Sequence, residues 1–214
     1  MPNQEQRADK KWSRRSEDRP AEIIAAALRL FAERGFAATT LEQVARQAGI
    51  TKGTLYLYFA SKEELFRAAV RQELLPNLAR LEAFLATYTG SIAALLRLLP
   101  APAALLMQSD IAGIPRLVLT EAGNFPEIAT FYAEEVLGRG MKLFEHVLRR
   151  GIAQGEFRDV EPRDLLPVFS GPILILLLAK QSVGRHAVLH FDVQKVLSTH
   201  IEMFLRGLAP DGAK

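Results

Sequence analysis

The sequence predicts an all-α protein of about nine helices, in which a small N-terminal domain precedes a larger helical one. Three observations lead to this prediction. Apolar residues recur at spacings of three and four along most of the chain. Capping residues and breaks that contain glycine or proline separate these runs. No segment alternates polar and apolar residues as a half-buried strand does, and no internal repeat is visible.

The N-terminal residues are charged and polar. Residues 1–19 lack helical or strand periodicity, so we expect them to form a flexible arm. Such an arm either stays solvated or enters the minor groove of DNA through Arg14 and Arg15. The first helix is expected to open at Pro20, which suits an initial helical turn. It is expected to end at Gly35, which can take the left-handed cap conformation.

Three further helix starts follow closely. Thr40 can cap a second helix that ends before Gly49. Thr51 can cap a very short third helix, and Ser61 with Glu64 forms a capping box that opens a long fourth one. Later helices are expected at about 91–99, 103–112, 126–154, 162–184 and 192–207.

The most informative stretch is residues 41–59, LEQVARQAGITKGTLYLYF, which has the spacing of two helices that cross through a tight turn. Ala45 has to be small where the helices approach, and Gly49 permits the positive φ of a sharp turn. The side chains expected to face inward are Val44, Ala45, Ala48, Ile50, Leu55 and Tyr58. Those expected to face outward on the third helix are Thr51, Lys52, Gly53, Thr54, Tyr56 and Leu57. Such small, hydrogen-bonding and cationic groups suit the major groove of DNA.

Three motifs, LFAERGF, TTLEQVARQAGITKGTLYLYF and SKEELF, span most of residues 23–66. They resemble the N-terminal pattern of the tetracycline-repressor-like family of transcriptional regulators. The resemblance implies phosphate contacts by some side chains and an approach to base edges by others on the third helix. The expected phosphate contacts are Thr40, Tyr56 and Lys62, the expected base contacts are Lys52, Gly53 and Thr54, and Thr51 completes the DNA-binding set. The alternative is that Thr40 is only a cap and Lys62 only a solvated lysine.

The same resemblance implies that the C-terminal half holds five more helices around an apolar ligand pocket. Residues 116–126, RLVLTEAGNFP, also resemble an element of one branch of the family's C-terminal domains. The candidate pocket residues are Leu105, Met107, Phe131, Tyr132, Met141, Phe144 and Phe169. Flexible or aromatic side chains commonly surround apolar ligands, although a plain packed core explains each of them equally well.

The last two helices carry more apolar surface than a monomer needs to bury, so we expect a homodimer. The resemblance implies that these helices pair with the partner subunit in a four-helix bundle. The candidate interface residues are Ile173, Leu174, Leu177, Leu178, Val196, Ile201, Phe204 and Leu205. A dimer matches two recognition helices to two half-sites about 34 Å apart, or a multiple of this, on a palindromic operator in double-stranded DNA.

The expected organisation is an arm at 1–19, a helix-turn-helix DNA-binding domain at 20–66, a helical regulatory and dimerisation domain at 67–209 and a tail at 210–214. We expect the ligand-free dimer to hold the operator and a small apolar or amphipathic effector to release it. Pro76 could kink the fourth helix and couple the domains, and Gly138 and Gly140 could permit bending farther along. The residues do not fix whether the protein represses or activates transcription.

Composition excludes several other classes. The chain has no cysteine, which rules out disulfides and thiolate metal sites and favours the cytoplasm. The polar N-terminus does not resemble a secretory signal. Residues 165–179 are the most apolar run, but prolines and a glycine interrupt them and they fall short of the roughly 20 residues of a membrane span. We therefore expect a buried helix and no membrane partner. The whole net charge of +3 lies in residues 1–82, which fits a nucleic-acid partner.

No catalytic chemistry is expected, because the chain has no Gly-rich phosphate loop, no G-x-S-x-G turn and no cysteine nucleophile. His186 and His190 have helical spacing, but the glutamate of a zinc hydrolase does not follow His186, so we expect no metal and no cofactor. The alternative that stays open is a DNA-binding dimer that senses no small molecule and is regulated through protein partners or abundance. A thermal-shift screen separates the two, because a ligand of the native state raises the melting temperature.

Overall fold

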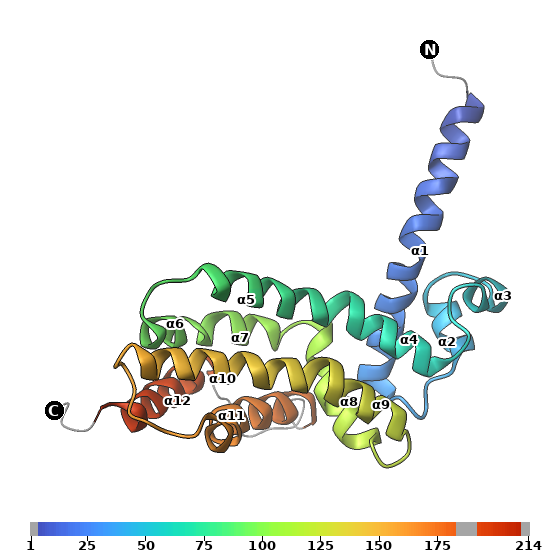
Figure 1. Ribbon diagram of the computed structural model, residues 1–214. Helices are drawn as coiled ribbons and strands as arrows, with labels where there is room; N and C mark the ends of the chain where they lie inside the picture. Colours follow the sequence, from blue (N-terminus) through green and yellow to red (C-terminus); the bar gives the residue numbers. More distant parts are fainter. Residues whose placement is uncertain (1–3, 183–191, 211–214) are drawn as a thin grey trace. The chain divides into compact units, whose positions relative to one another are not determined.

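In the computed structural model, the residues described are 4–182 and 192–210, and their regular structure is entirely helical (Figure 1). The predicted all-α fold class is confirmed. The chain divides into two compact units, residues 1–72 and 73–214. His186, His190 and most of the predicted tail at 210–214 lie outside the described residues.

The N-terminal unit contains four α-helices in its described part, and a π-helical segment crosses its boundary with the second unit. They are α1 (Gln4–Arg34), α2 (Leu41–Gln47), α3 (Lys52–Tyr56), α4 (Lys62–Ala69) and the segment η1 (Val70–Leu74). Helix α1 packs against α2 and α4, and α2 packs against α3. Three aromatic rings lie at the centre: Phe36 is 5.0 Å from Phe31 and 6.0 Å from Phe66 between ring centroids. Phe36 and Phe66 are fully buried, so these rings pack α1, the turn after it and α4 together.

The first helix begins earlier than the sequence predicted. We expected residues 1–19 to lie outside any helix, but α1 begins at Gln4 and continues through Pro20. That prediction of secondary structure was wrong. Apolar periodicity reports that a helix buries one face, so its absence before Pro20 does not exclude a helix. The segment is rich in Glu, Gln, Lys and Arg, which lose little side-chain freedom in a helix.

The C-terminal unit contains eight α-helices in its described part. They are α5 (Leu75–Thr87), α6 (Ile92–Leu98), α7 (Pro100–Leu106), α8 (Gly113–Glu121), α9 (Pro126–Tyr132), α10 (Gly138–Ala153), α11 (Pro162–Ser182) and α12 (Val193–Leu208). A 3-10 turn, η2 (Asp110–Ala112), precedes α8, and a π-helical segment, η3 (Ala133–Leu137), joins α9 to α10. Counting α4 with α5, α6 with α7 and α9 with α10 as single runs gives nine helices in the described residues, as predicted.

The middle of this unit differs from the prediction. We expected a helix over 103–112, but α7 ends at Leu106 and α8 occupies residues 113–121, where we expected none. Pro100 lies in the first turn of α7, where its missing N–H breaks no helical hydrogen bond. Helix α7 therefore begins at this proline, and the expected break between 99 and 103 shrinks to the single residue Leu99.

Helix α11 is more exposed than predicted. We expected residues 165–179 to be buried, but only 6% of the window Pro162–Ala179 is buried within the chain. By length and composition alone, this helix could also cross a membrane. It packs against α8, α10 and α12, and leaves Val168 and Ile175 exposed. The prediction of burial was wrong for the single chain. A helix that is apolar on all sides needs neighbours on all sides to be buried, and α8, α10 and α12 do not cover all of α11.

Glu156 closes the N-terminus of α6. Its carboxylate accepts hydrogen bonds from the Ser91 hydroxyl at 2.6 Å and from the backbone N–H groups of Ile92 at 2.9 Å and Ala93 at 2.8 Å. Burial opposes ionisation of Glu156, but the Ser91 hydroxyl and the two amides, with Arg150 nearby, outweigh it and lower the pKa of this carboxyl. The contact ties the loop after α10 to α6.

We expect Gly151→Ala to destabilise the protein by about 1–3 kcal/mol. A Cβ at position 151 would lie 2.2 Å from the ring of Phe157, which is itself buried and cannot move aside freely. Thermal unfolding followed by circular dichroism measures the change. The control is Gly140→Ala in the same helix, because a Cβ there meets nothing within 4 Å and alanine favours a helix over glycine by about 0.5–1 kcal/mol. Equal stability of the two variants would contradict the close packing at Gly151.

Candidate nucleic-acid interface

The turn between α2 and α3 depends on one glycine. Gly49 has φ +67°, the left-handed conformation that the sequence predicted. Its N–H donates to the Arg46 carbonyl at 3.2 Å, and the N–H of Ile50 donates to the Ala45 carbonyl at 2.9 Å. These two bonds form a Schellman motif, which ends α2 and turns the chain toward α3. Ala45 is almost fully buried, which agrees with the need for a small residue where the helices meet.

The hydroxyls of Thr40 and Thr51 cap the N-termini of α2 and α3. The Thr40 hydroxyl accepts from the N–H of Gln43 at 3.3 Å, and the Gln43 side chain accepts from the N–H of Thr40 at 2.9 Å. Thr51 begins α3 and accepts from the N–H of Thr54 at 3.1 Å, and the two hydroxyls lie 2.9 Å apart. Thr40 and Thr51 are both exposed, so their side chains remain accessible while they cap the helices. A threonine that fixes a helix start can also face a phosphate.

Helix α3 has one buried side and one exposed side. Leu55 is fully buried, whereas Lys52 and Gly53 are exposed and Thr54 is half-buried. Tyr56 is 45% exposed, so its ring is also accessible from the surface. The structure thus places the predicted residues of α3 on one short, capped helix.

Glu42 is a residue of this surface that sequence reasoning missed. Its carboxylate forms an ion pair with the Lys52 ammonium, which joins α2 to α3. The hydrogen bond from Lys52 lowers the pKa of Glu42 and raises the pKa of Lys52. The Lys52 ammonium also lies 5.7 Å from the centre of the Tyr56 ring. Residues 42 and 52 are too far apart in sequence to be paired by helical spacing, so only the crossing of the helices reveals the contact.

Lys62 has partners inside the N-terminal unit. Its ammonium donates to the backbone carbonyls of Phe36 at 2.6 Å and Ala37 at 3.3 Å, and lies 4.4 Å from the centre of the Phe36 ring. These contacts hold the turn after α1 against the start of α4. They give Lys62 a structural role that the sequence did not indicate, and its predicted phosphate contact stays a prediction.

Thr39 is a second residue that sequence reasoning missed. It is buried, and its hydroxyl lies 2.7 Å from the carbonyl of Gly35 and 3.3 Å from that of Leu30. The hydroxyl therefore donates where α1 ends, and the nearer acceptor is the carbonyl of Gly35. A threonine next to the predicted cap at Thr40 gives no separate sequence signal.

The seven candidate pocket residues do not come together as one set. Leu105 is 70% exposed, and Met107 is buried against Leu177 and Leu197. Phe131 and Tyr132 are buried in α9, Met141 is exposed, and the rings of Phe144 and Phe169 lie 5.0 Å apart beside the core of α6, α10 and α12. Burial raises the pKa of Tyr132 to about 12. Most of these side chains pack as ordinary core. A ligand pocket lined by them stays a prediction.

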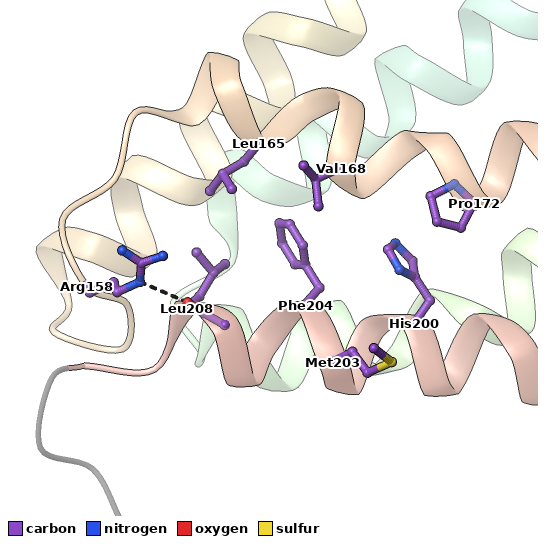
Figure 2. Close-up of a pocket in the computed structure, with 9 residues that line it drawn as sticks. Arg158, Leu165, Val168, Pro172, His200, Met203, Phe204 and Leu208 are labelled. Atoms are coloured by element: carbon purple, nitrogen blue, oxygen red, sulfur yellow. Dashed lines mark hydrogen bonds between the residues drawn. The ribbon is translucent and has the colours of Figure 1, made fainter.

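A groove of about 360 Å³ lies instead between α11 and α12 (Figure 2). Phe204 and His200 point from α12 toward α11, where Leu165, Val168 and Pro172 line the other side. At one end, Arg158 donates to the carbonyl of Gly207 at 2.9 Å, and along the groove a ring nitrogen of His200 lies 2.9 Å from the carbonyl of Phe169. The groove is mostly apolar, and its lining includes the exposed residues Val168 and Met203.

The predicted dimer residues divide into two sets. Leu177, Ile201, Phe204 and Leu205 are buried within their own subunit. Ile173, Leu174, Leu178 and Val196 are half-buried. The first set packs largely against its own chain, and the predicted contact of either set with a partner subunit stays a prediction. The large apolar side chains that are exposed on these helices are Val168, Ile175 and Met203.

These features define a class of protein, namely a helix-turn-helix DNA-binding protein with a second all-α unit. Residues 23–69 match the model for bacterial regulatory proteins of the tetR family, and residues 86–190 match the tetracyclin repressor-like C-terminal domain. The chain belongs to the tetR family. It is a DNA-binding transcription regulator and not an enzyme.

Individual relatives agree with this assignment. The HTH-type transcriptional regulator YfiR of Bacillus subtilis is 31% identical over 153 residues, which cover 67% of this chain and 70% of YfiR. The HTH-type transcriptional repressor KstR2 of Mycolicibacterium smegmatis is 29% identical over 146 residues, covering 68% of this chain and 70% of KstR2. The structure of FadR from Bacillus subtilis with stearoyl-CoA has a TM-score of 0.73 at 22% identity and covers 88% of this chain and 98% of FadR, a similarity of fold.

We expect Gly49→Ala to lower the stability of the fold and Gly53→Ala to weaken operator binding. Alanine at position 49 has to adopt φ +67°, which costs about 1–2 kcal/mol, so thermal stability falls. Alanine at position 53 places its Cβ 3.9 Å from the Thr51 hydroxyl, an ordinary contact, so stability should not fall. It weakens operator binding in fluorescence anisotropy, because the added methyl group keeps the backbone away from the base edges. Normal operator affinity of Gly53→Ala would count against a close approach at this position.

Proposed function

We propose that the protein is a homodimeric repressor that binds a palindromic operator and is released by a small apolar or amphipathic effector. The observation that carries this proposal is the exposed side of α3, where Lys52, Thr54 and Tyr56 stand on a helix fixed by the Gly49 turn. A single capped helix with small and hydrogen-bonding groups suits the major groove, where each base pair presents its own donor and acceptor pattern.

The proposed DNA contacts are of two kinds. Thr40 and Tyr56 contact phosphates and fix the register of the protein on the duplex. Lys62 does the same when its ammonium replaces its hydrogen bond to the Phe36 or Ala37 carbonyl with one to a phosphate oxygen. Lys52, Gly53 and Thr54 approach base edges, and Thr51 holds the start of the helix that carries them. Only this second kind of contact can read sequence directly.

A second copy of this chain is the proposed occupant of the face formed by α11 and α12. Ile175 of α11 is 64% exposed, and Met203 of α12, which lines the groove between these helices, is 69% exposed. Removing such apolar surface from water favours association of two copies. Two helices from each copy can cover one another as a four-helix bundle. The dimer then presents two α3 helices to two half-sites about 34 Å apart, or a multiple of that spacing.

The effector is proposed to bind in the C-terminal unit. FadR of Bacillus subtilis has been solved with stearoyl-CoA, and KstR2 of Mycolicibacterium smegmatis is named a repressor, which supports an apolar or amphipathic effector and repression. The aromatic side chains proposed to contact such a ligand are Phe131, Tyr132, Phe144 and Phe169, which lie in or against the core of this unit. The alternative is a dimer that senses no small molecule, and the thermal-shift screen decides between them. In either case we propose that the protein acts in the cytoplasm.

The proposed coupling runs through the chain segment between the two units. The π-helical segment η1 covers residues 70–74, and Pro76 lies in the first turn of α5. A π turn contains one extra residue relative to the α-helix, and such turns often mark functional positions. We propose that effector binding shifts this segment. A coupling of about 1–3 kcal/mol would change operator affinity on the order of 5- to 150-fold.

We expect selection from a random pool of DNA duplexes, at near-physiological salt, to recover a palindromic site. Nonspecific electrostatic binding weakens at this salt concentration, whereas base readout survives. The site should be lost with Tyr56→Ala, whose folding is checked by circular dichroism. Absence of any enriched sequence with the unmodified protein would overturn the proposal.

We expect the protein to sediment as a dimer at micromolar concentration and Ile175→Asp to sediment as a monomer. An aspartate there would bury an unpaired charge in the proposed interface. Leu137→Asp is the matched control, because Leu137 is also an exposed apolar residue but lies on η3, outside α11 and α12. A monomeric unmodified protein, or a dimeric Ile175→Asp, would contradict this interface.

A further inference from the structure

Glu42 stands on the surface proposed to meet DNA. It is the one acidic residue in the sequence between Ala38 and Ser61, the segment that carries α2 and α3. Its side chain is 51% exposed and forms an ion pair with Lys52, which is 57% exposed. A carboxylate repels the phosphates of an approaching duplex, and with Glu42 beside it Lys52 adds no net positive charge to this surface. A role for Lys52 as a phosphate contact leaves the presence of Glu42 unexplained.

We propose that Glu42 is a positioning residue that directs Lys52 toward base edges and away from phosphates, and thereby sets how strongly the protein prefers its operator to random DNA. This inference rests on the proposed DNA-binding role of α3. It assigns a specificity-determining function to a residue of α2, the helix that precedes the recognition helix.

The argument follows from the hydrogen-bonding capacity of the lysine. An ammonium group has three N–H donors, and Glu42 takes one of them. The other two can be donated to neutral acceptors on a base edge while the ion pair stays intact. A phosphate is itself an anion, so its contact with Lys52 either breaks the pair or brings a second negative charge beside Glu42. The pair therefore penalises a phosphate contact and permits a base contact.

The surroundings of the pair support this role. The Tyr56 ring centre lies 5.7 Å from the Lys52 ammonium, so the lysine is near an aromatic ring as well as paired with Glu42. The pair is not needed to hold α2 against α3, because the Schellman motif at Gly49 and the buried residues Val44 and Leu55 already do so. Exposed ion pairs also contribute little to stability in water. The pair is thus better explained by a role in binding than by one in folding.

The test compares Glu42→Gln with the unmodified protein on the selected operator and on a random duplex of equal length, over a range of salt concentrations. Lys52 becomes free to neutralise one phosphate, so the log–log salt slope on random DNA should steepen by about 0.9. Affinity for random DNA should rise more than affinity for the operator, and the ratio of the two affinities should fall severalfold. An unchanged ratio with an unchanged salt slope would overturn the inference.

Two further variants give this experiment its controls. Glu33→Gln makes the same change in net charge at an exposed position of α1, and should leave the ratio of affinities as it is. In a Lys52→Met background, Glu42→Gln should no longer steepen the salt slope, because the lysine that it releases is gone. An equal effect of Glu42→Gln with and without Lys52 would also overturn the inference. If the unmodified protein selects no operator, the proposed function is overturned. If it binds an operator and Glu42→Gln changes neither the affinity ratio nor the salt slope, only the inference about Glu42 is overturned.

Discussion

The left-handed turn at Gly49 is the constraint on which the DNA-binding surface depends. It ends α2, satisfies the last carbonyls of that helix and sets the direction in which α3 leaves. Every exposed group of α3, from Lys52 to Tyr56, takes its position from this single backbone conformation. The threonine caps and the buried Leu55 then fix the helix in place. Rigid placement of a few side chains is what base readout requires, because hydrogen bonds to base edges tolerate little displacement.

The N-terminal unit was largely predictable because its signals are local. Gly35 and Gly49 have the positive φ values that their places in the pattern required, and the caps at Thr40, Thr51 and Ser61 are all formed. Each of these features involves residues within a few positions of one another, so the order of residues in the chain carries the information. Helical periodicity located most of the C-terminal helices for the same reason.

The features that sequence reasoning missed depend on contacts between distant residues or on surroundings outside the chain. The Glu42–Lys52 pair and the contacts of Lys62 with the turn after α1 exist only once helices cross. The candidate dimer residues were chosen by hydropathy, which does not tell which side of α11 or α12 faces its own core. Burial of Leu177 and exposure of Ile175, two residues apart, illustrate this ambiguity. The positions of the pocket and of the operator contacts stay predictions.

The separation of α3 from α11 and α12 into different units has a genetic consequence. In the proposed dimer, a subunit with a damaged recognition helix keeps an intact association face and still pairs with normal subunits. Such mixed dimers carry one working α3 and can grip only one half-site, so they lose most of the affinity that two linked contacts provide. Alleles altered at Tyr56 would therefore be dominant over the normal gene when both are expressed. Alleles that break the α11 and α12 face would be recessive, because their products never enter a dimer.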